Sequence, residues 1–261
     1  MNAIGWCDET CNPVVGCYGP GGTAEEPARC GCCYAHRMAR RVAAMRAAAI
    51  GEPVCEECRD FVPHFHPERV EGMTRGSGRE QKRVVFVGSM CDLWSEGVLP
   101  EWRRAIWQAI GEEMQPWLEP ARSNYVMLTK RPWEIDRREL WYALGNKSFW
   151  LSNVWVGVSA GTQRECMMRW DELCDEVPAG RRILSLEPLA GWVTLVEPKP
   201  DWLIIGPETP VKRHAMRPCW AELQNMLREA REERVPVWMK TACEKAWPGI
   251  ELVQERPEEM R

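Results

Sequence analysis

The sequence predicts a single α/β domain built on parallel strands, either as a barrel or as an open doubly wound sheet. Six short apolar runs, often β-branched, recur along the chain. Continuous apolar runs of this kind are typical of parallel strands that are buried on both faces. Helix-like segments lie between the runs, and repeated alternation of strand and helix indicates an α/β architecture. No linker or low-complexity segment interrupts the pattern, so one domain is expected over residues 1–245, followed by a C-terminal tail at 246–261.

The expected elements follow one another along the chain. The apolar runs with their polar ends occupy residues 83–92, 123–132, 153–163, 181–191, 201–210 and 235–242. Helices are expected at 34–50, 100–119, 133–144, 162–177 and 218–233. On the first helix, one apolar face is predicted at helical spacing from Met38, Val42, Met45 and Ala49. Residues 52–83 are expected to form an irregular insertion, and the end of the tail, "QERPEEMR", to be loose.

Composition limits the class of protein. Hydrophobic residues make up 45% of the 261 positions and charged residues 28%, which is ordinary for a globular protein. No apolar run is long enough to span a bilayer, and "MNAIGWCDET" lacks the features of a secretory signal. We therefore expect a cytoplasmic protein, in which the 13 cysteines indicate metal binding or redox chemistry rather than a disulfide knot. The net charge of −4 argues against broad nucleic-acid binding but allows a local basic groove.

Polar residues cluster directly after the expected strands. In α/β barrels and open sheets the active site lies at the carboxyl ends of the strands. A succession of strand ends that offer hydroxyl, carboxylate, amide or cationic groups favours an enzyme over a passive scaffold. These residues are Ser89, Asp92, Thr129, Arg131, Ser159, Gln163, Glu187, Glu208 and Lys240.

The loop at residues 11–35 concentrates the cysteines. Cys30 and Cys33 form a C-x-x-C pair, and Cys17 lies 13 residues before Cys30 across a Gly/Pro-rich stretch. A structural zinc site would need four ligands, and Cys55 and Cys58 could form its second pair. Alternatively, an iron–sulfur cluster held by only three cysteines leaves one iron open to a small-molecule ligand. Radical S-adenosylmethionine enzymes require such an open iron to generate a 5′-deoxyadenosyl radical.

A series of motifs carries a family resemblance over about Gly5 to Lys240. In order, they are "IGWCDETCNPVVGC", "CYAHRMARR", "HFHPERV", "VGSMCDLW", "LTKRP", "NVWVGVS", "SLEPLAG" and "DWLIIGPE". Together they resemble a phage- and mobile-element-associated family of three-cysteine, radical-SAM-like proteins that is distantly similar to spore photoproduct lyase. The resemblance implies a partial (β/α) TIM-like barrel, a [4Fe–4S] cluster, S-adenosylmethionine and a flavodoxin- or ferredoxin-type reductant.

The resemblance also implies roles for particular residues. The cluster ligands fall on Cys17, Cys30 and Cys33, and Tyr34 and Ala35 complete a C-Y-A signature. The loop from Cys17 to Cys30 is longer than is usual for the family, and Cys32 replaces a polar residue, which makes it an alternative thiol at the cluster. By analogy with radical-SAM barrels, the cofactor is expected to meet Ser89, Met90 and Asp92 at its amino group, Ser159 and Gln163 at its ribose, and Glu187 and Glu208 more deeply. Asp92 could instead cap the next helix, and Ser159 could satisfy a loop amide.

The surplus cysteines leave a second metal open. Cys7, Cys11, Cys55 and Cys58 form two close pairs, the count for a second zinc or an auxiliary iron–sulfur cluster. They could equally pack as small buried hydrophobes. The remaining thiols are isolated in sequence and are expected in the core or in loops: Cys91, Cys166, Cys174, Cys219 and Cys243.

The expected substrate is a nucleobase or a base-linked group in phage DNA, modified in the host cytoplasm. One such reaction is the isomerisation of an amino-acid adduct during thymidine hypermodification. The hypothesis depends on the family resemblance and on basic residues expected at the mouth of the site: Arg37, Arg40, Arg41, Lys130, Arg131, Lys212, Arg213, His214 and Lys240. The rival hypothesis is a non-catalytic zinc or iron–sulfur module that docks a partner protein through some of the 15 tryptophans.

Overall fold

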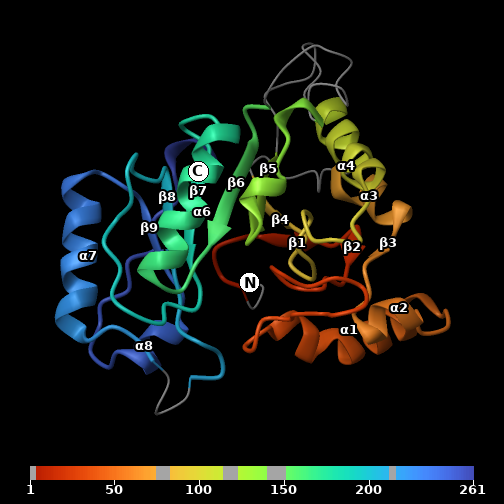
Figure 1. Ribbon diagram of the computed structural model, residues 1–261, viewed down its shortest axis with the longest axis horizontal. Helices are drawn as coiled ribbons and strands as arrows, with labels where there is room; N and C mark the ends of the chain where they lie inside the picture. Colours follow the sequence, from red (N-terminus) through yellow and green to blue (C-terminus); the bar gives the residue numbers. More distant parts are fainter. Residues whose placement is uncertain (1–3, 75–82, 114–122, 140–150, 212–215) are drawn as a thin grey trace.

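The protein forms a single α/β domain around a half-barrel of parallel strands (Figure 1). The computed structural model describes residues 4–74, 83–113, 123–139, 151–211 and 216–261. Seven strands form one sheet in the order β1-β4-β5-β6-β7-β8-β9, and every neighbouring pair is parallel. The predicted fold class, a partial α/β barrel, is confirmed.

Six of these strands lie in the six predicted apolar runs. They are β4 (Arg83–Val87), β5 (Ser123–Thr129), β6 (Val154–Ser159), β7 (Arg182–Leu186), β8 (Trp202–Ile205) and β9 (Val237–Met239). The edge strand β1 (Glu9–Cys11) was not predicted, because its three residues carry no apolar run. Side-chain contacts, rather than apolar residues of its own, support the pairing of β1 with β4. Arg83 Nη1 lies 2.9 Å from Glu9 Oε2, and Val84 N–H donates to Asp8 Oδ2 at 2.7 Å.

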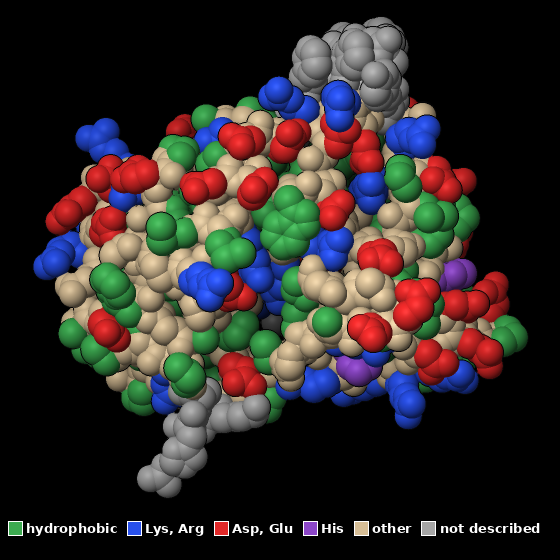
Figure 2. Space-filling model, viewed as in Figure 1, with side chains coloured by type: hydrophobic (Ala, Val, Ile, Leu, Met, Phe, Trp, Pro, Cys, Tyr) green, Lys and Arg blue, Asp and Glu red, His purple; other side chains and the backbone are tan. Residues whose placement is uncertain are grey.

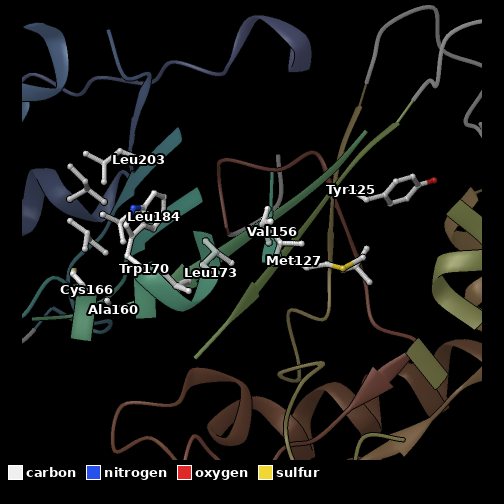
Figure 3. Packing of buried hydrophobic residues seen from close by; sticks show 14 of the residues in the cluster. Tyr125, Met127, Val156, Ala160, Cys166, Trp170, Leu173, Leu184 and Leu203 are labelled. Carbon is white, nitrogen blue, oxygen red and sulfur yellow. The ribbon is translucent and has the colours of Figure 1, made fainter. Parts of the chain in front are cut away.

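Both faces of the sheet are buried, which explains the continuous apolar runs. On the outer face, alternate strand residues pack beneath α4 (Pro100–Glu113), α6 (Gln163–Glu176) and α7 (Trp220–Glu232). Figure 3 shows Trp170 and Leu173 of α6 close to Leu184 and Leu203. On the inner face, the intervening strand residues form a second buried cluster. It contains three fully buried tryptophans: Trp6, and Trp155 and Trp202 from the strands themselves.

The C-terminal segment closes this inner face, so the expectation of a loose tail was wrong. Met260, in the short helix η2 (Glu258–Met260), is fully buried beside the inner tryptophans. Glu255 pairs its backbone N–H with Val237 O at 2.8 Å, and Arg256 forms a bidentate ion pair with Asp8. Hydropathy did not reveal this packing because the apolar Met260 stands among charged residues.

Helix α1 (Tyr34–Ile50) has the predicted bounds, but the predicted buried face was wrong. Its buried residues form an alanine stripe, Ala35, Ala39, Ala43 and Ala47, whereas Met45 is 61% exposed. The stripe packs against Phe61 and Met90, and Figure 1 shows α1 and α2 (Glu56–Asp60) side by side below the sheet. Small side chains allow this close approach, and large apolar side chains in the same positions would overfill the contact.

The described part of the insertion, residues 52–74, is more ordered than expected. It contains α2, the strand β3 (His64–Phe65) and α3 (Pro67–Thr74), and β3 pairs antiparallel with β2 (Val14–Val15). The later helices predicted at 162–177 and 218–233 correspond to α6 and α7, and α8 (Ala242–Ala246) follows β9.

Two predicted helices are described only in part. Helix α4 is described to Glu113, so the predicted extension to residue 119 lies outside the described residues. The helix expected at 133–144 begins in the short helix η1 (Pro132–Glu134), is interrupted at residues 135–136 and is helical again at 137–139, and its residues 140–144 lie outside the described part. Among the described helices, none has the length and apolar character needed to cross a membrane.

Candidate functional site

A cavity of about 450 Å³ lies at the carboxyl ends of the strands, against the N-terminal end of α1. Figure 2 shows this face of the molecule hollowed near its middle, with Lys or Arg side chains at the edge of the hollow. A cavity of this volume is typical of small-molecule sites. The structure brings together at its walls eight of the residues proposed from the sequence to contact cofactor or substrate: Tyr34, Ser89, Asp92, Lys130, Ser159, Glu187, Glu208 and Lys240.

Five cysteines line the cavity. They are the expected cluster ligands Cys17, Cys30 and Cys33, together with Cys32 and Cys91. Cys91 was expected to be an isolated core or loop thiol, and it reaches the cavity because it follows β4 directly. Burial raises the pKa of Cys17 to about 11, and the carboxylate of Asp92 adds to this effect. The thiol of Cys17 therefore holds a proton that a bound metal would displace.

Local backbone geometry positions Cys17. The preceding residue, Gly16, has a φ of +92°, and its Cα faces the backbone of Phe61 and Val62 so closely that a side chain has no room. Gly16 N–H donates to Met90 O at 2.9 Å, which joins the loop to the residues after β4. The glycine is therefore required where the chain turns from β2 into the cysteine loop.

Cys33 sits at the start of α1. Its Sγ atom caps the helix by accepting a hydrogen bond from His36 N–H at 3.3 Å. Helix α1 has no acidic residue in its first turn, so the positive end of its dipole is not neutralised there. The helix therefore directs a favourable potential at an anionic group held by the thiols.

Lys130 supplies a cation to the thiol group. Its Nζ atom lies 3.3 Å from Cys30 Sγ. Burial alone would lower the pKa of Lys130, but the neighbouring thiols of Cys30 and Cys32 outweigh burial and raise it. Lys130 therefore remains protonated beside the cysteines at neutral pH.

Asp92 connects two strand ends. Its carboxylate accepts hydrogen bonds from Thr129 Oγ1 at 2.7 Å, Lys130 N–H at 2.8 Å and Trp94 N–H at 3.1 Å. A carboxylate has about four acceptor positions, so these bonds leave little capacity for a ligand. Asp92 borders the cavity mainly as a positioning residue for Lys130.

Asn12 has a positioning role that the sequence did not suggest. Its Oδ1 atom accepts from Ser89 Oγ at 3.1 Å and from Met90 N–H at 2.8 Å. The residues after β4 are thereby held against the segment that leads to Cys17. No local pattern marks Asn12, because its partners lie more than 70 positions away.

Glu187 and Lys240 form an ion pair at the opposite side of the site. Lys240 Nζ lies 2.9 Å from Glu187 Oε2. The other carboxylate oxygen, Oε1, is buried and has no hydrogen-bond partner among the described residues. A buried acceptor without a donor is costly, so Glu187 Oε1 is a candidate to bind a ligand donor.

Several predicted residues lie elsewhere. Gln163 does not line the cavity, and its Oε1 accepts from Thr194 N–H at 2.7 Å. Met90 packs its side chain into the cluster beneath α1. Arg131 does not line the cavity, and it supports the cysteine loop by donating to Pro20 O at 2.8 Å. Exposed basic residues of α1 remain near the mouth, since Arg37 donates to Thr209 O at 2.6 Å.

Some predicted substrate contacts fall outside the described residues. They are Lys212, Arg213 and His214. The exposed Arg40 and Arg41 lie on α1 beyond Arg37.

The proposed second-metal set is corrected by the structure, which does not gather its four thiols. Cys7 is buried in the inner-face cluster with Trp6, whereas Cys58 is buried beneath α1. Cys11 donates from Sγ to Arg69 O at 3.5 Å. Pairing by sequence proximity failed here because Cys7 is buried on the inner face of the sheet and Cys11 ends β1, whereas Cys55 caps α2 and Cys58 lies in it.

Comparison with known proteins identifies a family but no relative of known function. No curated protein matches, and no solved structure matches. A family model described as a protein of unknown function, DUF5131, matches residues 1–256. Since this match spans nearly all of the sequence, the chain belongs to the DUF5131 family.

Proposed function

We propose that the protein is a radical S-adenosylmethionine enzyme whose [4Fe–4S] cluster is bound by Cys17, Cys30 and Cys33. The observation that carries the proposal is the meeting of these thiols with Lys130 and the N-terminal end of α1 at one cavity. A cluster bound by three thiolates is anionic, and a buried cation and a helix N-terminus both stabilise anions.

The spacing of the thiols supports a cluster over a single ion. In a tetrahedral zinc site with Zn–S bonds of about 2.3 Å, neighbouring sulfurs lie about 3.8 Å apart. Among the described residues, the cavity cysteines do not form a group of three whose ligand atoms all lie within 4.8 Å of one another. A cluster with several metal ions does not require its three thiols to lie as close together as the ligands of a single zinc ion.

The chain offers groups to bind the cofactor beside the cysteines. When bound and reduced, the cluster would supply the electron that cleaves S-adenosylmethionine to a 5′-deoxyadenosyl radical. Glu187 Oε1 can accept from the ammonium group of the cofactor, and Ser89 Oγ keeps an acceptor position beside Asn12. Ser159, the expected ribose contact, and Glu208, expected deeper in the site, both line the cavity. Gln163 is no longer proposed as a ribose contact, because it does not line the cavity.

The proposed substrate is a nucleobase or base adduct in phage DNA. Lys130 and Lys240 line the cavity, and Arg37, Arg40 and Arg41 are exposed on α1. Cationic side chains around a cavity suit a substrate that carries phosphates. A hydrogen-abstracting radical needs no general base, which agrees with a site in which Asp92 and the Glu187–Lys240 pair are already hydrogen-bonded.

Iron content tests the proposed cluster. Anaerobic reconstitution should give about four irons per chain. The triple variant Cys17→Ala, Cys30→Ala, Cys33→Ala should lose that iron, and Cys219→Ala, at an exposed thiol that caps the start of α7, should keep it. A triple variant with unchanged iron would contradict the assignment.

Product analysis tests the substrate. The proposal predicts that 5′-deoxyadenosine forms faster when modified phage DNA is added to the reduced protein. Cleavage that ignores nucleic acid would reject the substrate and keep the radical chemistry. An intact cluster that cleaves no S-adenosylmethionine would favour the non-catalytic docking module.

A further inference from the structure

Four side chains of metal-binding type lie close together where α2 faces β3. The ligand atoms of Cys55, His64 and His66 all lie within 4.8 Å of one another. Cys58 Sγ lies 2.9 Å from His66 Nε2. Cys58 is buried and the other three are half-buried.

Local structure explains how the four side chains converge. Cys55 caps α2, and Cys58, three residues later, donates its N–H to Cys55 Sγ at 3.4 Å. His64 begins β3 and His66 follows it two positions later, so both side chains lie on the same side of the strand. Their rings stand perpendicular, with centroids 4.7 Å apart. A short helix and a short strand thus each contribute two ligand atoms.

The surrounding groups orient His66 as a ligand. His66 Nδ1 lies 3.3 Å from Glu68 Oε1, so the carboxylate can hold the proton on Nδ1 and leave Nε2 facing Cys58. Metal-binding histidines usually have such a carboxylate partner on the second nitrogen. Arg69 Nε lies 3.5 Å from the same Glu68 oxygen.

We propose that Cys55, Cys58, His64 and His66 bind one zinc ion in a structural site. Two thiolates and two imidazoles are the ligand set of Cys₂His₂ zinc sites, in which four protein ligands close the tetrahedron. With Zn–S and Zn–N bonds of ordinary length, a sulfur and a nitrogen lie about 3.6 Å apart. Zinc binding therefore requires Cys58 Sγ and His66 Nε2 to move apart by less than about 1 Å. It also requires Cys58 Sγ to approach at least one of the other ligand atoms, because Cys58 lies outside the group of three that are all within 4.8 Å of one another.

The site fixes the strand that leads to Cys17. In the small sheet, Val15 pairs with His64, and Val14 pairs with Phe65. The chain then turns at Gly16, whose Cα packs on the residues just after α2. A zinc ion joining α2 to β3 would hold both surfaces against which this turn rests. The inference itself does not depend on what the cavity cysteines bind.

Zinc content and X-ray absorption test the proposal in the triple variant Cys17→Ala, Cys30→Ala, Cys33→Ala. That background removes the expected cluster ligands as an alternative source of zinc binding. We expect about one tightly held zinc per chain, with two sulfurs at about 2.3 Å and two nitrogens at about 2.0–2.1 Å. Adding Glu68→Gln should weaken zinc affinity about 10- to 100-fold by releasing His66. Adding His64→Asn with His66→Asn should abolish the two-nitrogen signal.

Matched changes elsewhere should leave the zinc in place. His36→Asn alters a histidine on α1, and Cys219→Ser alters an exposed thiol where serine is a good helix cap. Failure to bind zinc in the triple variant would overturn the proposal, as would a spectrum with four sulfurs and no nitrogen. The spectrum of the triple variant decides this even if the histidine variants fail to fold. The radical chemistry is tested by iron content and by formation of 5′-deoxyadenosine, and the zinc site by zinc content and X-ray absorption. Either proposal can therefore fail without the other.

Discussion

Lys130 Nζ donates a hydrogen bond to Cys30 Sγ at 3.3 Å, although the two residues are 100 positions apart. The contact joins the end of β5 to the cysteine loop across the cavity. Asp92 fixes the lysine from behind by accepting from its backbone N–H. A cation held in this way stabilises negative charge on whatever the thiols bind.

Removing this cation should lower the reduction potential of the reconstituted cluster. Reduction adds negative charge, so a neighbouring cation favours the reduced state. A charged hydrogen bond contributes about 1.5 kcal/mol or more, which for one electron corresponds to about 60 mV. Lys130→Met is therefore expected to shift the midpoint potential to more negative values by at least about this amount, measured by redox titration with electron paramagnetic resonance.

Two comparisons isolate the effect of charge at Lys130. Lys130→Arg should retain most of the potential because it keeps the cation. Lys245→Met, on α8, should leave the potential unchanged. Equal potentials for wild type and Lys130→Met at equal iron content would contradict the role assigned to Lys130.

Glu187 should contribute to cofactor affinity through its unpaired oxygen. Glu187→Gln preserves the shape of the side chain but removes the charge that an ammonium group would meet. Dissociation constants for S-adenosylmethionine, measured by calorimetry on the reconstituted protein, should rise about tenfold or more. Glu229→Gln is the matched control, because Glu229 pairs with Lys199 at 2.8 Å outside the cavity. Unchanged affinity in Glu187→Gln would remove this residue from the cofactor site.

The C-terminal segment should contribute to the stability of the barrel. Met260 is fully buried, so Met260→Ala leaves a cavity and should cost about 2–4 kcal/mol in the free energy of unfolding. Chemical denaturation measures this change. Met216→Ala, at a position 81% exposed, should change the free energy by less than about 0.5 kcal/mol. Equal free energies of unfolding for the two variants would contradict this role for Met260 and support the loose tail expected from the sequence.

Neighbouring alanines on α1 test which face is buried. Ala43→Leu places a large side chain in the close contact beneath the helix and should cost about 1–3 kcal/mol in the free energy of unfolding. Ala44→Leu makes the same substitution at the adjacent exposed position and should be nearly neutral. Thermal unfolding compares the two variants directly. A larger loss of stability for Ala44→Leu than for Ala43→Leu would contradict the assignment of the buried face of α1.

The sequence predicted the elements that carry strong local patterns. The strands β4 to β9 were found because both of their faces are buried, which makes each run apolar throughout. Residues such as Glu187 and Lys240 were placed at the cavity because parallel strands bring their carboxyl ends to one edge.

The failures have a common physical cause, because they depend on contacts between distant segments. Hydropathy gave more weight to Met45 than to the alanines, although close helix packing favours small side chains. Cys91 lines the cavity because the residues after β4 are joined to the segment before Cys17, where Gly16 N–H donates to Met90 O. The convergence of His64 with Cys55 depends on how α2 folds back on β3, which spacing in the sequence does not specify.

Formation of 5′-deoxyadenosine tests the central claim most directly. Anaerobic protein with about four irons per chain is mixed with S-adenosylmethionine and dithionite, and the products are separated by liquid chromatography. The proposal predicts 5′-deoxyadenosine from the wild-type protein and none from the triple variant Cys17→Ala, Cys30→Ala, Cys33→Ala. An intact, reducible four-iron cluster that leaves S-adenosylmethionine uncleaved would contradict it.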